Sequence, residues 1–135
     1  MADQKTILLF DDDPDDLEML EEAILSLYPQ TSIHAVTSLS DFWSCLERLS
    51  RQGLPHLIVL DFNMPGVTGA DVLLLLRRSR RYRNLPTLVW STSSSEAHRS
   101  ASLQSGASHY FVKPASFPDM VQQAKTMLTF CESDG

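Results

Sequence analysis

A short apolar run, Ile58-Val59-Leu60, stops abruptly at a carboxylate, Asp61, and is followed by turn-forming residues. The run shows no alternation of polar and apolar residues, which is typical of a strand buried on both faces of a sheet. The segment Met64-Pro65-Gly66 cannot simply continue such a strand. Asp61 is therefore expected at the carboxyl end of a buried strand, facing a loop.

The same pattern occurs near the start of the chain, where the run 7–10 leads into Asp11, Asp12 and Asp13. Asp13 followed by Pro14 is typical of a helix N-cap and a first helical residue, and further acids in that turn suit the helix dipole. We expect this segment to be a second buried strand that ends in acids and leads into a helix closed by Pro29.

Apolar periodicity places three further strands and four further helices along the chain. The strands are expected at 32–36, 87–90 and 110–112, and the helices at about 40–52, 68–83, 93–105 and 117–130. The alternation of strands and helices predicts an α/β fold with a doubly wound, five-stranded parallel sheet and five helices. The arginines at 77–83 fall at a helix end, where cations are favoured, and we interpret them as a solvated helix end.

Size and composition limit the class of protein. The 135 residues fit one domain, 1–135, with a core at about 5–130, and the short polar end favours a complete, stand-alone chain. No segment approaches the ~20 apolar residues of a membrane span, and the first residues lack an apolar signal core. Cys45 and Cys131 cannot build a disulfide framework, so a cytoplasmic location is expected. The net charge of −6 argues mildly against nucleic acid as the main partner.

Polar side chains follow most of the expected strands, at the edge where ligands bind in doubly wound sheets. They are Asp11, Asp12, Asp61, Ser91 and Lys113. Three clustered carboxylates repel one another unless a cation joins them, and hard oxygen ligands favour Mg²⁺. A lysine and a hydroxyl can then hold the outer oxygens of a phosphoryl group while one carboxylate attacks the phosphorus.

With these residues in place, the chain resembles the receiver domains of two-component response regulators over practically its whole length. The resemblance rests on four segments in order: the acidic pair after 7–10, the segment 61–66 with Gly69, the strand 86–91, and Gly106-Ala107 leading into 110–114. Each segment is modest alone, but their order and spacing together are specific. The resemblance implies the flavodoxin-like strand order 2-1-3-4-5.

The resemblance also implies a phosphoacceptor and a metal site. Asp61 would accept phosphate from a histidine kinase or a histidine phosphotransfer protein. The side chains of Asp12 and Asp61 and the main-chain carbonyl of Asn63 would bind Mg²⁺ or Mn²⁺, and Asp11 would act through water. The domain would be a signalling protein and not an enzyme, with at most slow self-dephosphorylation.

Further roles follow from the resemblance for the residues around the phosphoryl group. Ser91 would hydrogen-bond the phosphoryl group, Lys113 would pair with it, and Tyr110 would report it by changing rotamer. The Lys113–Pro114 bond is often cis in relatives. Ser91 stands where threonine is more frequent, and the family assigns no role to Trp90.

The leading hypothesis is a receiver that signals to a separate output protein through the face made by the fourth helix, the fifth strand and the fifth helix. Two alternatives stay open. The first is a phosphorylation-independent adaptor, against which the intact acids, Ser91 and Lys113 count. The second is a phosphohydrolase with Asp61 as nucleophile. Haloacid-dehalogenase-like phosphatases have a second aspartate two residues later, where this chain has Asn63.

Overall fold

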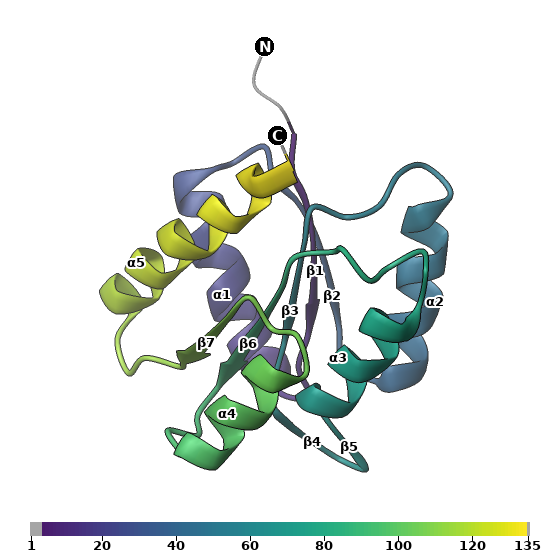
Figure 1. Ribbon diagram of the computed structural model, residues 1–135. Helices are drawn as coiled ribbons and strands as arrows, with labels where there is room; N and C mark the ends of the chain where they lie inside the picture. The colour runs from purple at the N-terminus through teal and green to yellow at the C-terminus, as the bar shows by residue number, and fades with distance from the viewer. Residues whose placement is uncertain (1–3, 135) are drawn as a thin grey trace.

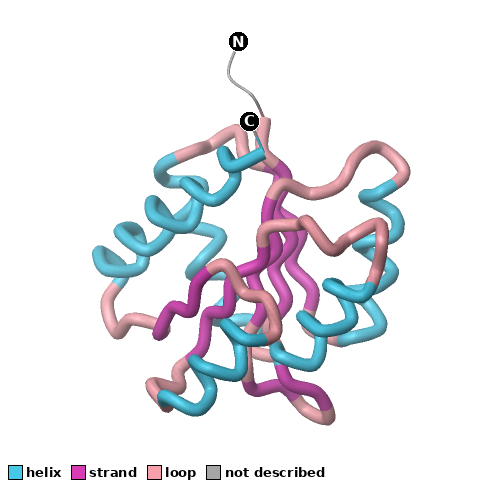
Figure 2. The backbone as a smooth tube through the Cα atoms, viewed as in Figure 1, coloured by secondary structure: helices cyan, strands magenta, loops and turns pink. Residues whose placement is uncertain are grey.

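The centre of the structure, a computed structural model that describes residues 4–134, is a parallel sheet of five strands (Figures 1 and 2). Its order, β2-β1-β3-β6-β7, confirms the predicted order 2-1-3-4-5. The strands are β1 (Thr6–Phe10), β2 (Ser32–Val36), β3 (Leu57–Leu60), β6 (Thr87–Ser91) and β7 (His109–Val112). Each begins and ends within one residue of its predicted position, and only residues 1–3 and 135 of the predicted domain lie outside the described residues.

Five helices cover the two faces of the sheet, as predicted: α1 (Pro14–Leu27), α2 (Leu39–Ser50), α3 (Gly69–Arg78), α4 (Glu96–Gln104) and α5 (Phe117–Leu128). Figure 1 shows α1 and α5 on one face and α2 and α3 on the other, and α4 packs against α3 and β7. A short 3₁₀ helix, η1 (Thr129–Asp134), follows α5. The predicted N-cap of α1 is confirmed, because the Asp13 carboxylate accepts hydrogen bonds from the N–H groups of Asp15 and Asp16.

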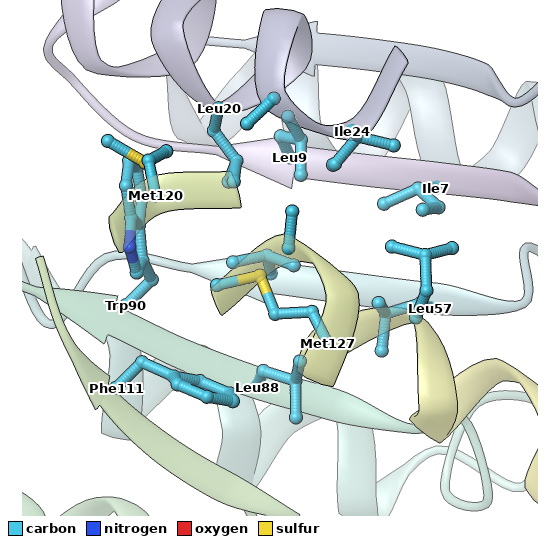
Figure 3. Packing of buried hydrophobic residues seen from close by; sticks show 14 of the residues in the cluster. Ile7, Leu9, Leu20, Ile24, Leu57, Leu88, Trp90, Phe111, Met120 and Met127 are labelled. Carbon is cyan, nitrogen blue, oxygen red and sulfur yellow. The ribbon is translucent and has the colours of Figure 1, made fainter. Parts of the chain in front are cut away.

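Apolar layers on both faces of the sheet hold the helices in place. On the side of α1 and α5, Figure 3 shows the close packing of strand and helix residues that include Leu9, Leu20, Ile24, Leu88 and Met127. On the other side, Phe10 of β1 stacks on Phe42 of α2 with ring centroids 5.1 Å apart. Burial of these side chains drives folding and fixes the sheet between its two helical layers.

The register of the strands decides where the acids lie. Phe10 of β1 is paired with Leu60 of β3, and the N–H of Asp61 donates to the carbonyl of Phe10 at 3.0 Å. The two neighbouring strands therefore end at the same level. Asp11 and Asp61 are the first residues after them, which places both acids at the same edge of the sheet.

A small hairpin after Asp61 was not predicted from the sequence. It consists of β4 (Asn63–Met64) and β5 (Val67–Thr68), which pair antiparallel. Gly66 has a φ of 76° in the connecting turn, a conformation that glycine adopts without steric cost. Strand β3 already ends at Leu60, and the segment 64–66, which was predicted to prevent simple continuation of the strand, reverses the chain into a paired turn.

The interpretation of the arginines as a solvated helix end is wrong for Arg77. The Nε and Nη2 atoms of Arg77 donate to the Gly106 carbonyl at 3.2 and 2.8 Å, and burial lowers the pKa of its guanidinium. Helix α3 also ends at Arg78, earlier than predicted, because the hydroxyl of Ser79 accepts N–H groups from the next turn. The other arginines of the cluster are exposed: Arg78, Arg80, Arg81 and Arg83.

The bond between Lys113 and Pro114 differs from the form that is frequent in relatives. No peptide bond is cis within residues 4–134, so this bond is trans. The trans form is favoured by about 0.5–1 kcal/mol in unconstrained X–Pro bonds, and Lys113 reaches the acids without the cis form. The part of the chain that the structure describes holds no helix with the length and apolar character needed to cross a membrane.

Candidate functional site

The acids predicted at the strand ends lie together. Asp11 and Asp61 are only 1% and 7% exposed, whereas Asp12 is exposed to solvent. Each of the three carboxylates offers an oxygen, and these oxygens all lie within 4.8 Å of one another. The sheet edge therefore gathers the carboxylates on which the predicted chemistry depends.

Within residues 4–134, one ammonium group, that of Lys113, contacts this cluster. The Nζ atom of Lys113 lies 2.6 Å from Asp11 Oδ2 and 3.6 Å from Asp61 Oδ2. It also lies 2.7 Å from Oδ2 of Asp16, a contact with hydrogen-bond geometry that the sequence did not predict. The Lys113 side chain is only 7% exposed, and that of Asp16 is 28% exposed. Three carboxylates thus share one cation, and negative charge is in excess.

Burial dominates the electrostatics of the site. It raises the pKa of Asp11 from 3.8 to about 7, although Lys113 and the N–H of Asp13 act in the opposite direction. Burial also raises the pKa of Asp61, while the charge of Lys113 and the N–H of Asn63 lower it. For Lys113, burial lowers the pKa, but its hydrogen bonds to Asp11 and Asp16 and the nearby charges outweigh this effect and raise it. Both acids therefore lack a cation strong enough to offset their desolvation fully.

The donor set fits a hard divalent cation. Carboxylate oxygens from Asp11, Asp12 and Asp61 converge, and such ligands suit Mg²⁺ or Mn²⁺, which keep several waters and need few protein ligands. Asn63 begins β4, and its N–H points to Asp61 Oδ1 at 3.4 Å. Ligation by the main-chain carbonyl of Asn63 stays a prediction.

The predicted switch residues are joined through Ser93. Ser91 is the last residue of β6 and is completely buried, and its Oγ accepts the N–H of Ser93 at 3.2 Å. The Tyr110 hydroxyl, buried behind this loop, donates to the Ser93 carbonyl at 2.7 Å. His98 extends the network, because its Nδ1 lies 2.7 Å from Ser93 Oγ and its ring stacks on Phe62, the residue after Asp61. A displacement of Ser91 would therefore act on Tyr110 through one intervening residue.

Trp90, to which the sequence assigned no role, lies beside the site. Its side chain is buried, and the Nζ atom of Lys113 lies 4.8 Å from the centroid of its ring, within the range of a cation–π interaction. Its indole N–H donates to Oε1 of Gln123 on α5 at 3.0 Å. Trp90 thus connects the site lysine to helix α5.

Asp16 is the site residue that the sequence analysis missed, although a signal was present. It lies four residues before Leu20, a fully buried residue of α1. Residues four apart share a helix face, so Asp16 lies on the inward face of α1 while its neighbour Asp15 is exposed. From the sequence, the acids of this turn were expected to cap the helix or to strengthen divalent-ion binding, and neither expectation distinguished Asp16 from Asp15.

Gly69 allows the start of α3 to approach the segment after β3 closely. A Cβ atom at this position would lie 2.6 Å from the main-chain oxygen of Asp61 and 3.2 Å from Cα of Phe62. The N–H of Gly69 donates to the carbonyl of Phe62 at 2.8 Å. The absence of a side chain at Gly69 is therefore part of what positions Asp61.

Comparison with known proteins gives a consistent picture. A family model for the response regulator receiver domain matches residues 7–125. The chain is 34% identical to the transcriptional regulatory protein PrrA of Mycobacterium tuberculosis over 122 residues, which is 90% of this chain and 49% of PrrA. The chain spans about a third to a half of the length of several curated relatives.

Solved structures with the same fold include two response regulators. The phosphorylated cyanobacterial phytochrome response regulator RcpA aligns with a TM-score of 0.85 at 24% identity, over 98% of this chain and 97% of RcpA. The Mn²⁺-bound form of response regulator Rcp1 aligns with a TM-score of 0.79 at 22% identity, over 93% of both chains. At these identities the likeness shows the fold, which is the receiver fold.

Proposed function

Because the chain belongs to the response regulator receiver family, we propose that Asp61 accepts a phosphoryl group from a phosphohistidine donor in an Mg²⁺-dependent reaction. The observation that carries this proposal is the position of Asp61 at the end of β3, with oxygens of Asp11 and Asp12 nearby and Lys113 Nζ 3.6 Å away. The donor would be a histidine kinase or a histidine phosphotransfer protein.

In the proposed reaction, a carboxylate oxygen of Asp61 attacks the phosphorus of the phosphohistidine. The new O–P bond forms as the P–N bond breaks, and the donor imidazole keeps the electron pair of that bond. Lys113 and Ser91 are the groups that would stabilise the phosphoryl oxygens, one by charge and one by a hydrogen bond. Both side chains are almost completely buried, so the phosphoryl group would meet donors that are held in place by the fold.

The metal ligands in this proposal are the carboxylates of Asp11, Asp12 and Asp61 and the main-chain carbonyl of Asn63, with Asp11 acting through water. When bound, Mg²⁺ or Mn²⁺ would neutralise negative charge on the phosphoryl oxygens. The oxygen donor set and the Mn²⁺-bound form of Rcp1, a protein of the same fold, support this assignment. The excess of acids over cations at the site supports it further.

The proposed output is a change of surface that a separate protein reads. Phosphorylation adds about −1.5 to −2 charges, and movement of Ser91 toward them would act on Ser93 and Tyr110 through their hydrogen bonds. The affected face is made by α4, β7 and α5, where Leu103, Val112 and Phe117 are exposed apolar residues. We place this function in one receiver domain, residues 1–135, in the cytoplasm, with at most slow self-dephosphorylation.

A mass measurement tests the proposal. The protein is incubated with acetyl phosphate and MgCl₂, and its intact mass is followed with time. We expect the wild-type protein to gain the mass of one phosphoryl group, while Asp61→Asn and a wild-type sample with excess chelator stay unmodified. Unmodified wild-type protein, or equal labelling of Asp61→Asn, would contradict the proposal and favour the phosphorylation-independent adaptor.

A further inference from the structure

Lys113 is held by helix α1 as well as by the acids at the strand ends. Its contact with Asp16 Oδ2, at 2.7 Å, is as short as its contact with Asp11 Oδ2, at 2.6 Å. Both are shorter than the 3.6 Å that separates the ammonium from Asp61 Oδ2. The ammonium is therefore closer to Asp16 than to the residue whose phosphoryl group it is expected to bind.

The carboxylate of Asp16 takes no part in the N-cap of helix α1. The α1 N-cap is Asp13, and the side chain of Asp16 is not its partner there, because Asp16 contributes only its N–H to the cap. Its carboxylate makes one contact in the described residues, with Lys113, and is partly exposed. The neighbouring acid in the same helical turn, Asp15, is exposed and its carboxylate makes no contact with Lys113.

A lysine ammonium has three donors, and their directions are fixed relative to one another. Two of these donors face Asp11 and Asp16, and the ammonium has to move to bring its third donor within hydrogen-bond distance of an oxygen on Asp61, which lengthens or bends its bond to Asp16. The carboxylate of Asp16 also adds a negative charge close to the position where a doubly charged phosphoryl group would form. Both effects favour the unphosphorylated arrangement.

We propose that Asp16 is a positioning residue that competes with the phosphoryl group for Lys113, and so slows phosphorylation of Asp61. This inference rests on the proposed function. Transfer of Lys113 from Asp16 to the phosphoryl group would also break a link between α1 and the segment after β7, because these two residues belong to those elements. Phosphorylation would thereby loosen the attachment of α1 to the loop that leads into α5.

Trp90 provides a reporter of the lysine position that does not depend on phosphorylation. The Nζ atom of Lys113 lies 4.8 Å from the centroid of the Trp90 ring, so a shift of the ammonium changes the electrostatic environment of the indole. The chain has two tryptophans. Replacement of the other one, Trp43 on α2, by phenylalanine leaves Trp90 as the only source of tryptophan emission.

The test uses Asp16→Asn, which removes the charge and keeps the size, in the full chain with Trp43→Phe. Asp15→Asn is the matched control, since it removes the same charge from the same turn. Asp16→Glu restores the charge and tests rescue. Far-UV circular dichroism and thermal melting check that every variant is folded. Two quantities are measured: the rate of mass gain with acetyl phosphate and MgCl₂, and the Trp90 emission before any phosphodonor is added.

We expect Asp16→Asn to be phosphorylated about two- to five-fold faster than the parent, the size expected for loss of a partly exposed ion pair. Its Trp90 emission should differ from the parent, while Asp15→Asn and Asp16→Glu stay close to the parent in both measurements. Equal rates for Asp16→Asn and Asp15→Asn, or a slower rate for Asp16→Asn, would overturn competition by Asp16.

The two proposals fail in different ways. If no protein, the parent included, gains mass, the proposed function fails and competition with a phosphoryl group fails with it, while the emission still tests whether Asp16 holds Lys113. In that case, unchanged Trp90 emission in Asp16→Asn shows that Asp16 does not hold Lys113. If the parent gains mass and Asp16→Asn behaves like Asp15→Asn, only the inference about Asp16 fails.

Discussion

The middle and the carboxyl end of strand β3 bury opposite kinds of side chain. Ile58 and Leu60 have no exposed surface, and Asp61, one residue beyond the strand, is only 7% exposed. The same contrast occurs in β1, where Phe10 and Asp11 are 2% and 1% exposed. Burial of the apolar residues stabilises the fold, whereas burial of the acids raises their pKa and opposes ionisation.

Along single strands, the residues that stabilise the fold are therefore followed directly by the residues of the candidate site. The apolar residues hold the sheet between its helices, and the residue immediately beyond the strand introduces a desolvated charge that the rest of the protein only partly neutralises. Lys113 is shared among three acids, so the edge keeps an excess of negative charge. In the proposed function, a divalent cation would balance this excess before the phosphoryl group arrives.

The largest effect should come from the middle of β3. Ile58→Ala removes a fully buried side chain and leaves a cavity in the sheet, so we expect the free energy of unfolding to fall by about 2–5 kcal/mol. Urea denaturation followed by circular dichroism measures the change. A loss below about 1 kcal/mol would show that this position is less tightly packed than its burial indicates.

A smaller effect is expected where α3 approaches Asp61. Gly69→Ala places a Cβ atom 2.6 Å from the main-chain oxygen of Asp61, and a main-chain atom cannot move aside without shifting the strand end. We expect a loss of about 1–3 kcal/mol in unfolding free energy together with slower labelling by acetyl phosphate. Unchanged stability and labelling would mean that the position of Asp61 tolerates displacement.

The buried acids predict a pH dependence. The folded protein binds a proton at Asp11 more tightly than the unfolded chain does, because its pKa is raised from 3.8 to about 7. Without divalent ions, the favourable contribution of Asp11 to the unfolding free energy is fully present at pH values below 3.8. It should be lost as the pH rises from 3.8 to about 7, by about 1.4 kcal/mol for each unit of the pKa difference.

The measurement compares wild-type protein with Asp11→Asn across that pH range. The difference in unfolding free energy between the two isolates the contribution of Asp11 from that of the other carboxylates. A difference that does not change with pH would contradict the raised pKa.

The smallest effect should come from neutralising the end of β3 itself. Burial raises the pKa of the Asp61 carboxyl, so Asp61→Asn removes a group whose ionisation opposes folding. We therefore expect the protein without divalent ions to become slightly more stable near neutral pH. Asp15→Asn, at an exposed position in α1, serves as the control and should change the stability little. A clear loss of stability in Asp61→Asn would mean that the ionised carboxylate supports the fold.

The strands and the acids at their ends were predictable, whereas long-range contacts were not. The apolar runs before Asp11 and Asp61 can be recognised as buried strands from the sequence alone, because a strand buried on both faces is apolar throughout. The hairpin of β4 and β5 has two residues in each strand, too few for any periodicity.

The missed contacts join residues far apart in the chain. Arg77 bonds the Gly106 carbonyl, 29 residues later, and Lys113 bonds Asp16, 97 residues earlier. Cations are favoured at the end of any helix and acids in its first turn, whether or not a distant partner is present. The sequence therefore does not reveal these contacts. Only the three-dimensional arrangement shows which of several similar acids and arginines face inward.

The excess negative charge at the strand ends is tested most directly by the effect of Mg²⁺ on unfolding. Urea denaturation is measured above pH 7, with and without MgCl₂, for wild-type protein, Asp12→Asn and the control Asp15→Asn. Binding to the folded state alone stabilises by about 2.7 kcal/mol at a concentration 100 times the Kd. We expect wild-type protein and Asp15→Asn to be stabilised alike and Asp12→Asn much less. No stabilisation of the wild type, or equal stabilisation of Asp12→Asn, would contradict a cation site built from these acids.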